Sequence, residues 1–256
     1  MSLATIKSAR RVFEVLEYFD AQRRPLSLKE ICGHYGYPPS SGAAVLKSLV
    51  LLGYLEYDKP SRTYLPTMRI AALGGWVTTD LFGGLNIIEL MAALRDETQE
   101  TVILAAQSDC HAQYVHVVHS NQALTYAVTP GTLRPLARSG FGRLLLSGHG
   151  DAAIRAIVRR IDAARDPDED KVDVDDLLKA VAVIRRDGFA LSNNLITPGV
   201  GTIGVLLPET PFGRKFAIGL GGPSARIAAA KQKHLTRLRE TVAKFTDRLA
   251  SRGAAG

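Results

Sequence analysis

Residues 199–204 are the first of three stretches in the 256-residue chain whose residue types could carry chemistry. They match the G-x-G-x-x-G pattern of dinucleotide-binding loops. That pattern holds a pyrophosphate only where a strand precedes it and a helix follows, because the helix N-terminus must face the phosphates. Here a loop with Pro198 precedes it and a strand-like run, residues 205–207, follows. We therefore expect no dinucleotide site and no cofactor.

A second stretch brings together potential metal ligands, namely Cys110, His111, His116 and His119. On a strand, residues three apart point to opposite faces, so His116 and His119 cannot converge on one ion without a bulge. We expect no metal site and interpret His116 as a pocket or core residue. The sequence holds no G-x-S-x-G elbow, Walker loop or H-E-x-x-H helix, so no catalytic residue is predicted.

The third stretch, residues 139–142, has the sequence Ser-Gly-Phe-Gly and reads as a turn from a strand into a helix. Backbone NH groups at a helix N-terminus can hold a carboxylate. Three basic residues close by could pair with an acidic ligand: Arg134, Arg138 and Arg143. A helix start with glycines for close packing, beside solvated arginines, explains the same residues. The sequence leaves both interpretations open.

Residues 25–66 form the most informative segment of the chain, because they predict two short helices joined by a tight turn. Ser27 and Glu30 have the spacing of a capping box, in which each side chain accepts a hydrogen bond from the other residue's backbone NH. Gly36 is expected to end the first helix. Pro39 presets the backbone for the first turn of the second.

A two-stranded hairpin is predicted to follow, once Gly53 has ended the second helix. Its strands are residues 54–57 and 63–65, around a turn at residues 58–62. A further helix at residues 5–19 would pack beneath as a third leg. This order is that of a winged helix-turn-helix, with the hairpin as the wing.

Such a unit can place its second helix in the major groove of DNA, while basic groups on the wing and the other helices hold phosphates. The inward face of that helix is predicted to be Val45, Leu46, Leu49 and Leu52, and the outward face Ser40, Ser41, Ala43, Ala44 and Lys47. The predicted DNA contacts are Arg10, Arg11, Ser27, Lys29, Ser40, Ser41, Lys47, Lys59 and Arg62. The same spacing also occurs in structural domains and in winged helices that bind proteins.

The rest of the chain mixes strands and helices without strict alternation, which indicates an α+β domain with an antiparallel sheet. Strands are expected at residues 101–107, 112–118, 123–129, 189–191, 201–207 and 215–221. Helices are expected from residue 86 and at residues 139–147, 152–161, 174–186 and 225–249.

The predicted domains are residues 1–66, a linker helix at 67–84, and residues 85–256. Glycines inside the linker helix weaken it, so a partner is expected to order it. Trp76 is interpreted either as a dimer contact or as a residue packed on its own second domain.

Composition places the chain among ordinary globular proteins, with 46% hydrophobic and 22% charged residues. A net charge of +7 favours a polyanionic partner, although the nine basic and six acidic residues of positions 1–66 are no larger an excess than elsewhere. No stretch of 18 apolar residues is present, and the N-terminus lacks the apolar core of a signal peptide. We expect a cytoplasmic protein without a membrane span. Cys32 and Cys110 are expected in different domains, without a disulfide.

The chain resembles the IclR-type bacterial transcriptional regulators over nearly its whole length. In the N-terminal part, the resemblance lies in residues 36–41, Gly-Tyr-Pro-Pro-Ser-Ser, and 53–56, Gly-Tyr-Leu-Glu. In the C-terminal part it lies in Leu133, Arg134, Pro135 and Leu136 with Gly142, and in residues 188–190, 198–200 and 222–223. The resemblance implies a GAF-like effector-binding domain, a homodimer or homotetramer, a palindromic operator in double-stranded DNA, and a small organic acid or aromatic metabolite as effector.

The second helix departs from the family pattern. Pro39, Ala43 and Ala44 stand where the family usually has Lys, His and Arg, so base recognition should depend on Ser40, Ser41 and Lys47. Gly42 replaces a usual apolar core residue, and we expect it to loosen the helix.

The positions matching the family's effector pocket are Gly140, Phe141, Ser192, Thr202, Gly219 and Gly221. Sensors of small acids offer an acidic side chain and two serines where this chain has Ser192, Gly219 and Gly221. Fewer polar groups and more space predict a larger, more apolar effector, such as an aromatic acid or its thioester.

These observations predict a ligand-responsive DNA-binding regulator. One alternative is a metabolite-converting enzyme with an appended winged helix, using Ser139, His116 or Cys110. Another is a scaffold that binds no nucleic acid.

Overall fold

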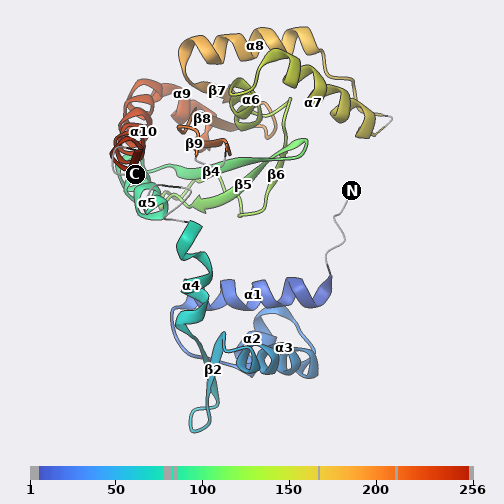
Figure 1. Cartoon of the computed structure of the whole chain (residues 1–256), viewed down its shortest axis with the longest axis vertical. Coiled ribbons are helices and arrows are strands. Elements are labelled where there is room, and N and C mark those ends of the chain that lie inside the picture. Colours follow the sequence, from blue (N-terminus) through green and yellow to red (C-terminus); the bar gives the residue numbers. More distant parts are fainter. Residues whose placement is uncertain (1–5, 78–81, 83–85, 167, 211–212, 254–256) are drawn as a thin grey trace. The chain divides into compact units, whose positions relative to one another are not determined.

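The chain forms two compact units, residues 1–77 and 78–256. The computed structural model describes residues 6–77, 82, 86–166, 168–210 and 213–253, with side chains up to residue 247. The predicted helix start at Thr5, the end of the predicted linker helix at residues 78–81 and the glycine pair at 83–84 lie outside the described residues. Figure 1 shows the first unit in colours from blue to teal and the second from green to red.

The first unit is a winged helix-turn-helix, as the sequence predicts. Its elements are α1 (Lys7–Gln22), β1 (Leu26–Ser27), α2 (Leu28–Tyr35), α3 (Pro39–Leu51), β2 (Leu55–Asp58), β3 (Thr63–Pro66) and α4 (Met68–Trp76). The strands form an antiparallel sheet in the order β1-β3-β2. Its core is built from α1, α2, α3 and the strands, and comprises Val15, Phe19, Leu26, Ile31, Leu46, Leu49 and Leu55.

Local signals in the sequence set the ends of α2 and α3. Both hydrogen bonds of the capping box between Ser27 and Glu30 are present, and they lower the pKa of the exposed Glu30 carboxyl to about 2. Gly36 and Gly53 follow the two helices in the left-handed conformation, with φ of 66° and 75°. Glycine adopts this conformation without a steric penalty. The predicted inward position of Leu52 is wrong, because it lies past the last helical residue and is 57% exposed.

Gly42 contradicts the expectation of a loose α3. A Cβ atom at this buried position would lie 2.3 Å from the Cys32 sulfur and 3.3 Å from Leu28 Cδ1. Side chains of α2 already fill the space that an apolar side chain at position 42 would occupy. The missing side chain therefore lets α2 and α3 pack closely.

We expect the Gly42→Ala substitution to lower the free energy of unfolding by about 1–3 kcal/mol, because added atoms overpack a filled contact. Gly33→Ala is the matched control on the same pair of helices, since nothing lies within 4 Å of a Cβ there. Alanine is the better helix former, so the control should gain about 0.5–1 kcal/mol. Urea denaturation followed by circular dichroism measures both. The double variant Cys32→Ala/Gly42→Ala should recover stability, whereas a stabilised Gly42→Ala would show that the contact is loose.

The helix α4 has no buried residue. Thr67 caps it, accepting a hydrogen bond from the Arg69 NH group and donating one to the Gly53 carbonyl. Trp76 is 55% exposed. Its role as a dimer contact stays a prediction.

The second unit is an α+β fold around one six-stranded sheet. Its elements are α5 (Ile87–Thr98), β4 (Thr101–Ser108), β5 (His111–Val118), β6 (Leu133–Pro135), α6 (Gly140–Ser147), α7 (Asp151–Ala164), α8 (Val174–Asp187), β7 (Ala190–Asn193), β8 (Val200–Leu206), β9 (Phe216–Pro223), α9 (Ser224–Ala229) and α10 (Lys231–Gly253). The strand order is β6-β5-β4-β9-β8-β7, and every pairing is antiparallel.

Helices cover both faces of this sheet, as Figure 1 shows. The helix α6 packs on one face, α8 packs on α6 and α7 on α8, whereas α5, α9 and α10 pack on the opposite face. Five of the eight residues of α6 are buried, so this short helix forms the centre of its layer. Among the described residues, no helix is both long and apolar enough to cross a membrane.

Two expectations for this unit are wrong. Residues 123–129 form no strand, although Tyr126 and Val128 are buried. This segment is held by the side chain of Thr101, whose hydroxyl donates to the Tyr126 carbonyl at 3.1 Å. The third strand of this unit is instead β6. The expected final helix is interrupted at Ala230, which has a non-helical φ of −96° and ψ of 13°.

A buried ion pair ties α9 to the start of β4. Glu100 is 1% exposed, and Arg226 donates to both of its carboxylate oxygens, at 2.6 Å for the Nη2–Oε2 pair. His234 of α10 is 2% exposed, and among the residues that the structure describes neither ring nitrogen has a hydrogen-bond partner. Burial lowers the pKa of this imidazole.

Candidate functional site

The outward face of α3 carries the small polar and basic groups that the sequence predicts. Ser40 and Lys47 are exposed and Ser41 is half-buried, whereas Leu46 and Leu49 face the core. A helix with this division can place its outward side chains against another surface without exposing its core. Lys29 on α2 and Arg10 on α1 are also exposed.

The wing ends in a defined turn. Asp58 accepts hydrogen bonds from the Ser61 hydroxyl and, at 3.1 Å, from the Ser61 backbone NH, and these bonds lower the pKa of its carboxyl. Arg62 has a left-handed φ of 54°. Lys59 and Arg62 are both exposed, so the tip of the wing presents two cations to solvent.

Two of the predicted contact residues are engaged inside the unit. The Ser27 hydroxyl donates to Glu30 at 2.7 Å and accepts from the Glu30 NH, so it is used by the capping box. Arg11 lies over the ring of Tyr37, 4.8 Å from its centroid, and its buried Nε has no hydrogen-bond partner in the described ranges. Tyr37 in turn donates to Glu14. The Arg11 side chain is therefore held against Tyr37, two residues before α3 begins.

In the second unit, a small cavity with both polar and apolar walls lies at the N-terminus of α6. It is lined by Tyr114, Tyr126, Arg134, Ser139, Gly140, Ser192, Leu195, Ile196, Thr197, Val200 and Thr202. Its free volume is about 20 Å³, which is room for a single water molecule. Ser192 and Thr202 are paired across β7 and β8, and their hydroxyls lie 2.8 Å apart.

Arg134 brings a positive charge to this cavity. It pairs with Ala112 across β6 and β5, and its Nη2 donates to the Tyr126 hydroxyl at 2.9 Å. Its Nε is buried and has no hydrogen-bond partner within the described part of the chain. Tyr114 is 3% exposed, and burial raises the pKa of its phenol. No acidic side chain lines the cavity in the part of the chain that is described.

The six predicted effector residues fall into two groups. Gly140, Ser192 and Thr202 line the cavity, but Phe141, Gly219 and Gly221 do not. The predicted additional space is absent. A Cβ atom on Gly219 would lie 2.9 Å from the Phe141 ring and 2.4 Å from a backbone oxygen, and one on Gly221 would lie 2.6 Å from the Tyr126 ring.

Sequence reasoning named Arg134 as a possible partner of an acid, but missed both tyrosines of the cavity. Tyr114 lies on β5 and Tyr126 on the irregular segment that was expected to be a strand. Their spacing carries no signal of convergence, because the pairing of β5 with β6 places Tyr114 near Arg134, whereas Tyr126 reaches Arg134 from the irregular segment.

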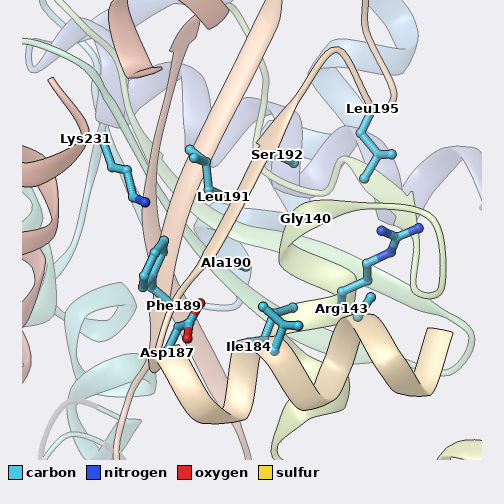
Figure 2. Close-up of a pocket in the computed structure, with 12 residues that line it drawn as sticks. Gly140, Arg143, Ile184, Asp187, Phe189, Ala190, Leu191, Ser192, Leu195 and Lys231 are labelled. Carbon is cyan, nitrogen blue, oxygen red and sulfur yellow. The ribbon is translucent and has the colours of Figure 1, made fainter. Parts of the chain in front are cut away.

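An open groove of about 360 Å³ adjoins the cavity and shares Gly140, Ser192 and Leu195 with it. Figure 2 shows Arg143 and Lys231 on opposite sides of this groove. Lys231 lies over the Phe189 ring, 4.9 Å from its centroid. Burial lowers the pKa of Arg143, whose Nε donates to the Ala137 carbonyl at 3.0 Å.

The remaining sequence motifs take structural roles. The pattern at residues 199–204 lies almost entirely within β8, and no helix follows it. Among the described residues, no group of three or more His, Cys, Asp and Glu side chains is arranged to hold a metal ion. Ser139 caps α6 by accepting from the Gly142 NH group at 3.0 Å. Cys32 and Cys110 are free thiols.

Family models match both units. Residues 8–59 match the IclR helix-turn-helix domain, and residues 85–247 match the C-terminal domain of the bacterial transcriptional regulator IclR. The chain belongs to the IclR family. Members of this family are transcriptional regulators and not enzymes, so the alternative of a metabolite-converting enzyme is not supported.

Individual IclR-family proteins are similar over most of the chain. The regulator KdgR of Escherichia coli K12 is 23% identical over 93% of this chain and 88% of its own. The effector domain of a putative IclR regulator from Acinetobacter sp. ADP1 is 33% identical, with a TM-score of 0.59 over 66% of this chain and 98% of that domain. An IclR homologue from Microbacterium hydrocarbonoxydans, solved in complex with 4-hydroxybenzoate, is 19% identical. Its TM-score is 0.57 over 96% of this chain and 100% of that chain.

Proposed function

We propose that this IclR-family regulator binds a palindromic operator as a homodimer or homotetramer. A small organic acid is proposed to raise or lower its affinity for that operator. In this proposal residues 1–66 bind DNA, residues 67–84 link the domains, and residues 85–256 bind the effector. The protein acts in the cytoplasm, where its DNA is. The observation that carries the DNA half is the face of α3, which turns Ser40 and Lys47 to solvent while Leu46 and Leu49 anchor it.

The dimensions of a helix explain why this face suits DNA. An α-helix fits the major groove, where its outward side chains reach base edges. Ser40, Ser41 and Lys47 would read bases, and the small Ala44 beside them allows close approach. The cations Arg10, Lys29, Lys59 and Arg62 would hold phosphates on either side. Ser27 would support DNA binding indirectly by capping α2, and Arg11 would contact DNA from its position against Tyr37.

Lys47→Ala is expected to weaken operator binding by about 1–3 kcal/mol, or roughly 5- to 150-fold, and to relax the preference at one base pair. Arg62→Ala should instead weaken all sequences alike and reduce the slope of log K against log[salt] by about 1, because it removes a phosphate contact. Fluorescence anisotropy with a duplex that the wild-type protein selects from a random pool measures both quantities.

Lys244→Ala is the matched control, since this exposed lysine lies on α10 of the other unit. It should change neither affinity nor slope. If all three variants bind the duplex like the wild type, the chain does not use this face. A selected sequence without dyad symmetry, or a monomer by native mass spectrometry, would remove the palindromic part of the proposal.

The effector half is supported by the cavity at α6, which combines a cation, hydroxyl groups and apolar walls. Such a combination is typical of sites for small molecules, where few polar groups fix the orientation of a mostly apolar ligand. The effector is proposed to be an aromatic or otherwise apolar organic acid or its thioester. One IclR homologue of the same fold was solved with 4-hydroxybenzoate. Repeating the operator titration with this compound should change the affinity about 5- to 150-fold if the two sites are coupled.

A further inference from the structure

We propose that Arg134 is the residue that selects the effector, and that the effector is a free aromatic monocarboxylate and not a thioester. This inference rests on the proposed ligand-responsive function and deepens it. It starts from a charge that has no charged partner among the described residues. Arg134 is half-buried, its buried Nε makes no hydrogen bond to any of those residues, and the described lining of its cavity contains no carboxylate.

Withdrawing a guanidinium group from water is costly unless an anion and hydrogen bonds replace the lost solvent. Arg226 meets that requirement, because it pairs with the carboxylate of Glu100. Arg134 has phenol groups around it instead. Tyr126 accepts from its Nη2, and the pKa of Tyr114 is raised by burial, so that phenol stays neutral. A bound anion would supply the missing charge.

The geometry of guanidinium favours a carboxylate as that anion. Its planar fork of NH groups matches two carboxylate oxygens, which makes such pairs strong and specific. The hydroxyls of Ser192 and Thr202, 2.8 Å apart, lie in the same cavity and can donate to an anion. A thioester has no carboxylate, so it would leave Arg134 as unpaired as it is without ligand.

The other walls define the body of the ligand. Tyr114 and Tyr126 bring aromatic rings to the cavity, and Leu195, Ile196 and Val200 bring aliphatic groups. A flat, apolar ring suits these surfaces. The ligand-free cavity holds only about 20 Å³, so an aromatic ring enters only as the side chains of Leu195 and Ile196 move outward. Both are already about 40% exposed, at 41% and 39%, on the segment that follows β7.

The test is isothermal titration calorimetry of the full chain with benzoate, benzamide and S-ethyl thiobenzoate, three probes that share one ring. We expect benzoate to bind 10- to 100-fold more tightly than the two neutral probes. The Arg134→Met variant should bind benzoate only as tightly as benzamide, and the Arg134→Lys variant should bind benzoate with an intermediate affinity. Arg138→Met is the matched control, because Arg138 lies four residues away but donates to the Asp170 carbonyl outside this cavity. It should bind benzoate like the wild type.

A structural role for Arg134 makes a different prediction. If the guanidinium only held Tyr114 and Tyr126 in place, Arg134→Met would melt well below the wild type without ligand. We expect an unchanged or higher melting temperature, because replacing a half-buried charge that lacks a carboxylate partner costs little.

The proposal is overturned if the neutral probes bind as tightly as benzoate, if none of the three binds, if Arg138→Met loses as much as Arg134→Met, or if ligand-free Arg134→Met is strongly destabilised. These results leave the operator titrations unaffected. If the protein failed to bind DNA but kept its selectivity for benzoate, the proposed function would be contradicted and the role of Arg134 would not.

Discussion

Replacing Gly142 by alanine is expected to destabilise the second unit by about 3 kcal/mol or more, the upper end of the overpacking range. A Cβ atom there would lie 2.1 Å from the carbonyl oxygen of Leu136 and 2.7 Å from its carbonyl carbon. These are backbone atoms, so no side chain can swing aside. Leu136 is fully buried, and its NH donates to the Cys110 carbonyl at 3.1 Å. The chain around it is therefore fixed on both sides.

Against a typical domain stability of about 5–15 kcal/mol, such a loss would remove much of the folded population. Thermal melting by circular dichroism and the soluble fraction on expression measure it. Gly150→Ser is a suitable control, because Gly150 caps α7 and nothing lies within 4 Å of a Cβ there. Serine is a good N-cap residue, so this variant should be at least as stable as the wild type. A soluble Gly142→Ala protein with an unchanged melting temperature would contradict the close approach.

Arg226→Ala is the second substitution with a large expected effect, about 3–5 kcal/mol of lost stability. Arg226 supplies both hydrogen bonds to a Glu100 side chain that is only 2% exposed. Removing it leaves a buried carboxylate without its partner, and α9 loses its link to the start of β4. Urea denaturation gives the loss directly.

Arg237→Ala is the matched control on the neighbouring helix. Arg237 also forms ion pairs, with Glu97 at 3.4 Å and Glu240 at 2.7 Å, but its side chain is 43% exposed. Exposed pairs contribute about 0–1 kcal/mol, so this variant should be nearly neutral. The double variant Glu100→Leu/Arg226→Leu should recover part of the stability lost in Arg226→Ala, since it leaves no charge behind. Equal losses for Arg226→Ala and Arg237→Ala would show that burial of the Glu100 pair has no energetic consequence.

The N-terminal unit could be predicted from the sequence because its signals are local. The capping box of Ser27 and Glu30 and the glycines at 36 and 53 act within a few residues, so α2 and α3 begin and end close to the expected positions. What could not be predicted depends on contacts between elements. The space beside Gly42 is filled by Cys32 on another helix, and no pattern within α3 reveals that.

The second unit shows the same division. The alternation of residues 123–129 resembles a strand, but the segment has buried side chains without a strand partner. Instead, the side chain of Thr101 bonds its backbone. The cavity could be located from Gly140, Ser192 and Thr202. Its two tyrosines come from parts of the chain that only the folded sheet brings together.

The position of α6 has a consequence for how occupancy of the cavity could be transmitted. Its first turn is part of the cavity wall through Ser139 and Gly140, while its remaining residues are packed between the sheet and α8. Close-packed interiors have low compressibility, so a displacement at one end of a packed helix moves the whole helix. A ligand that displaces this first turn would therefore shift α6 as a whole, and with it the helix α8 that packs on it.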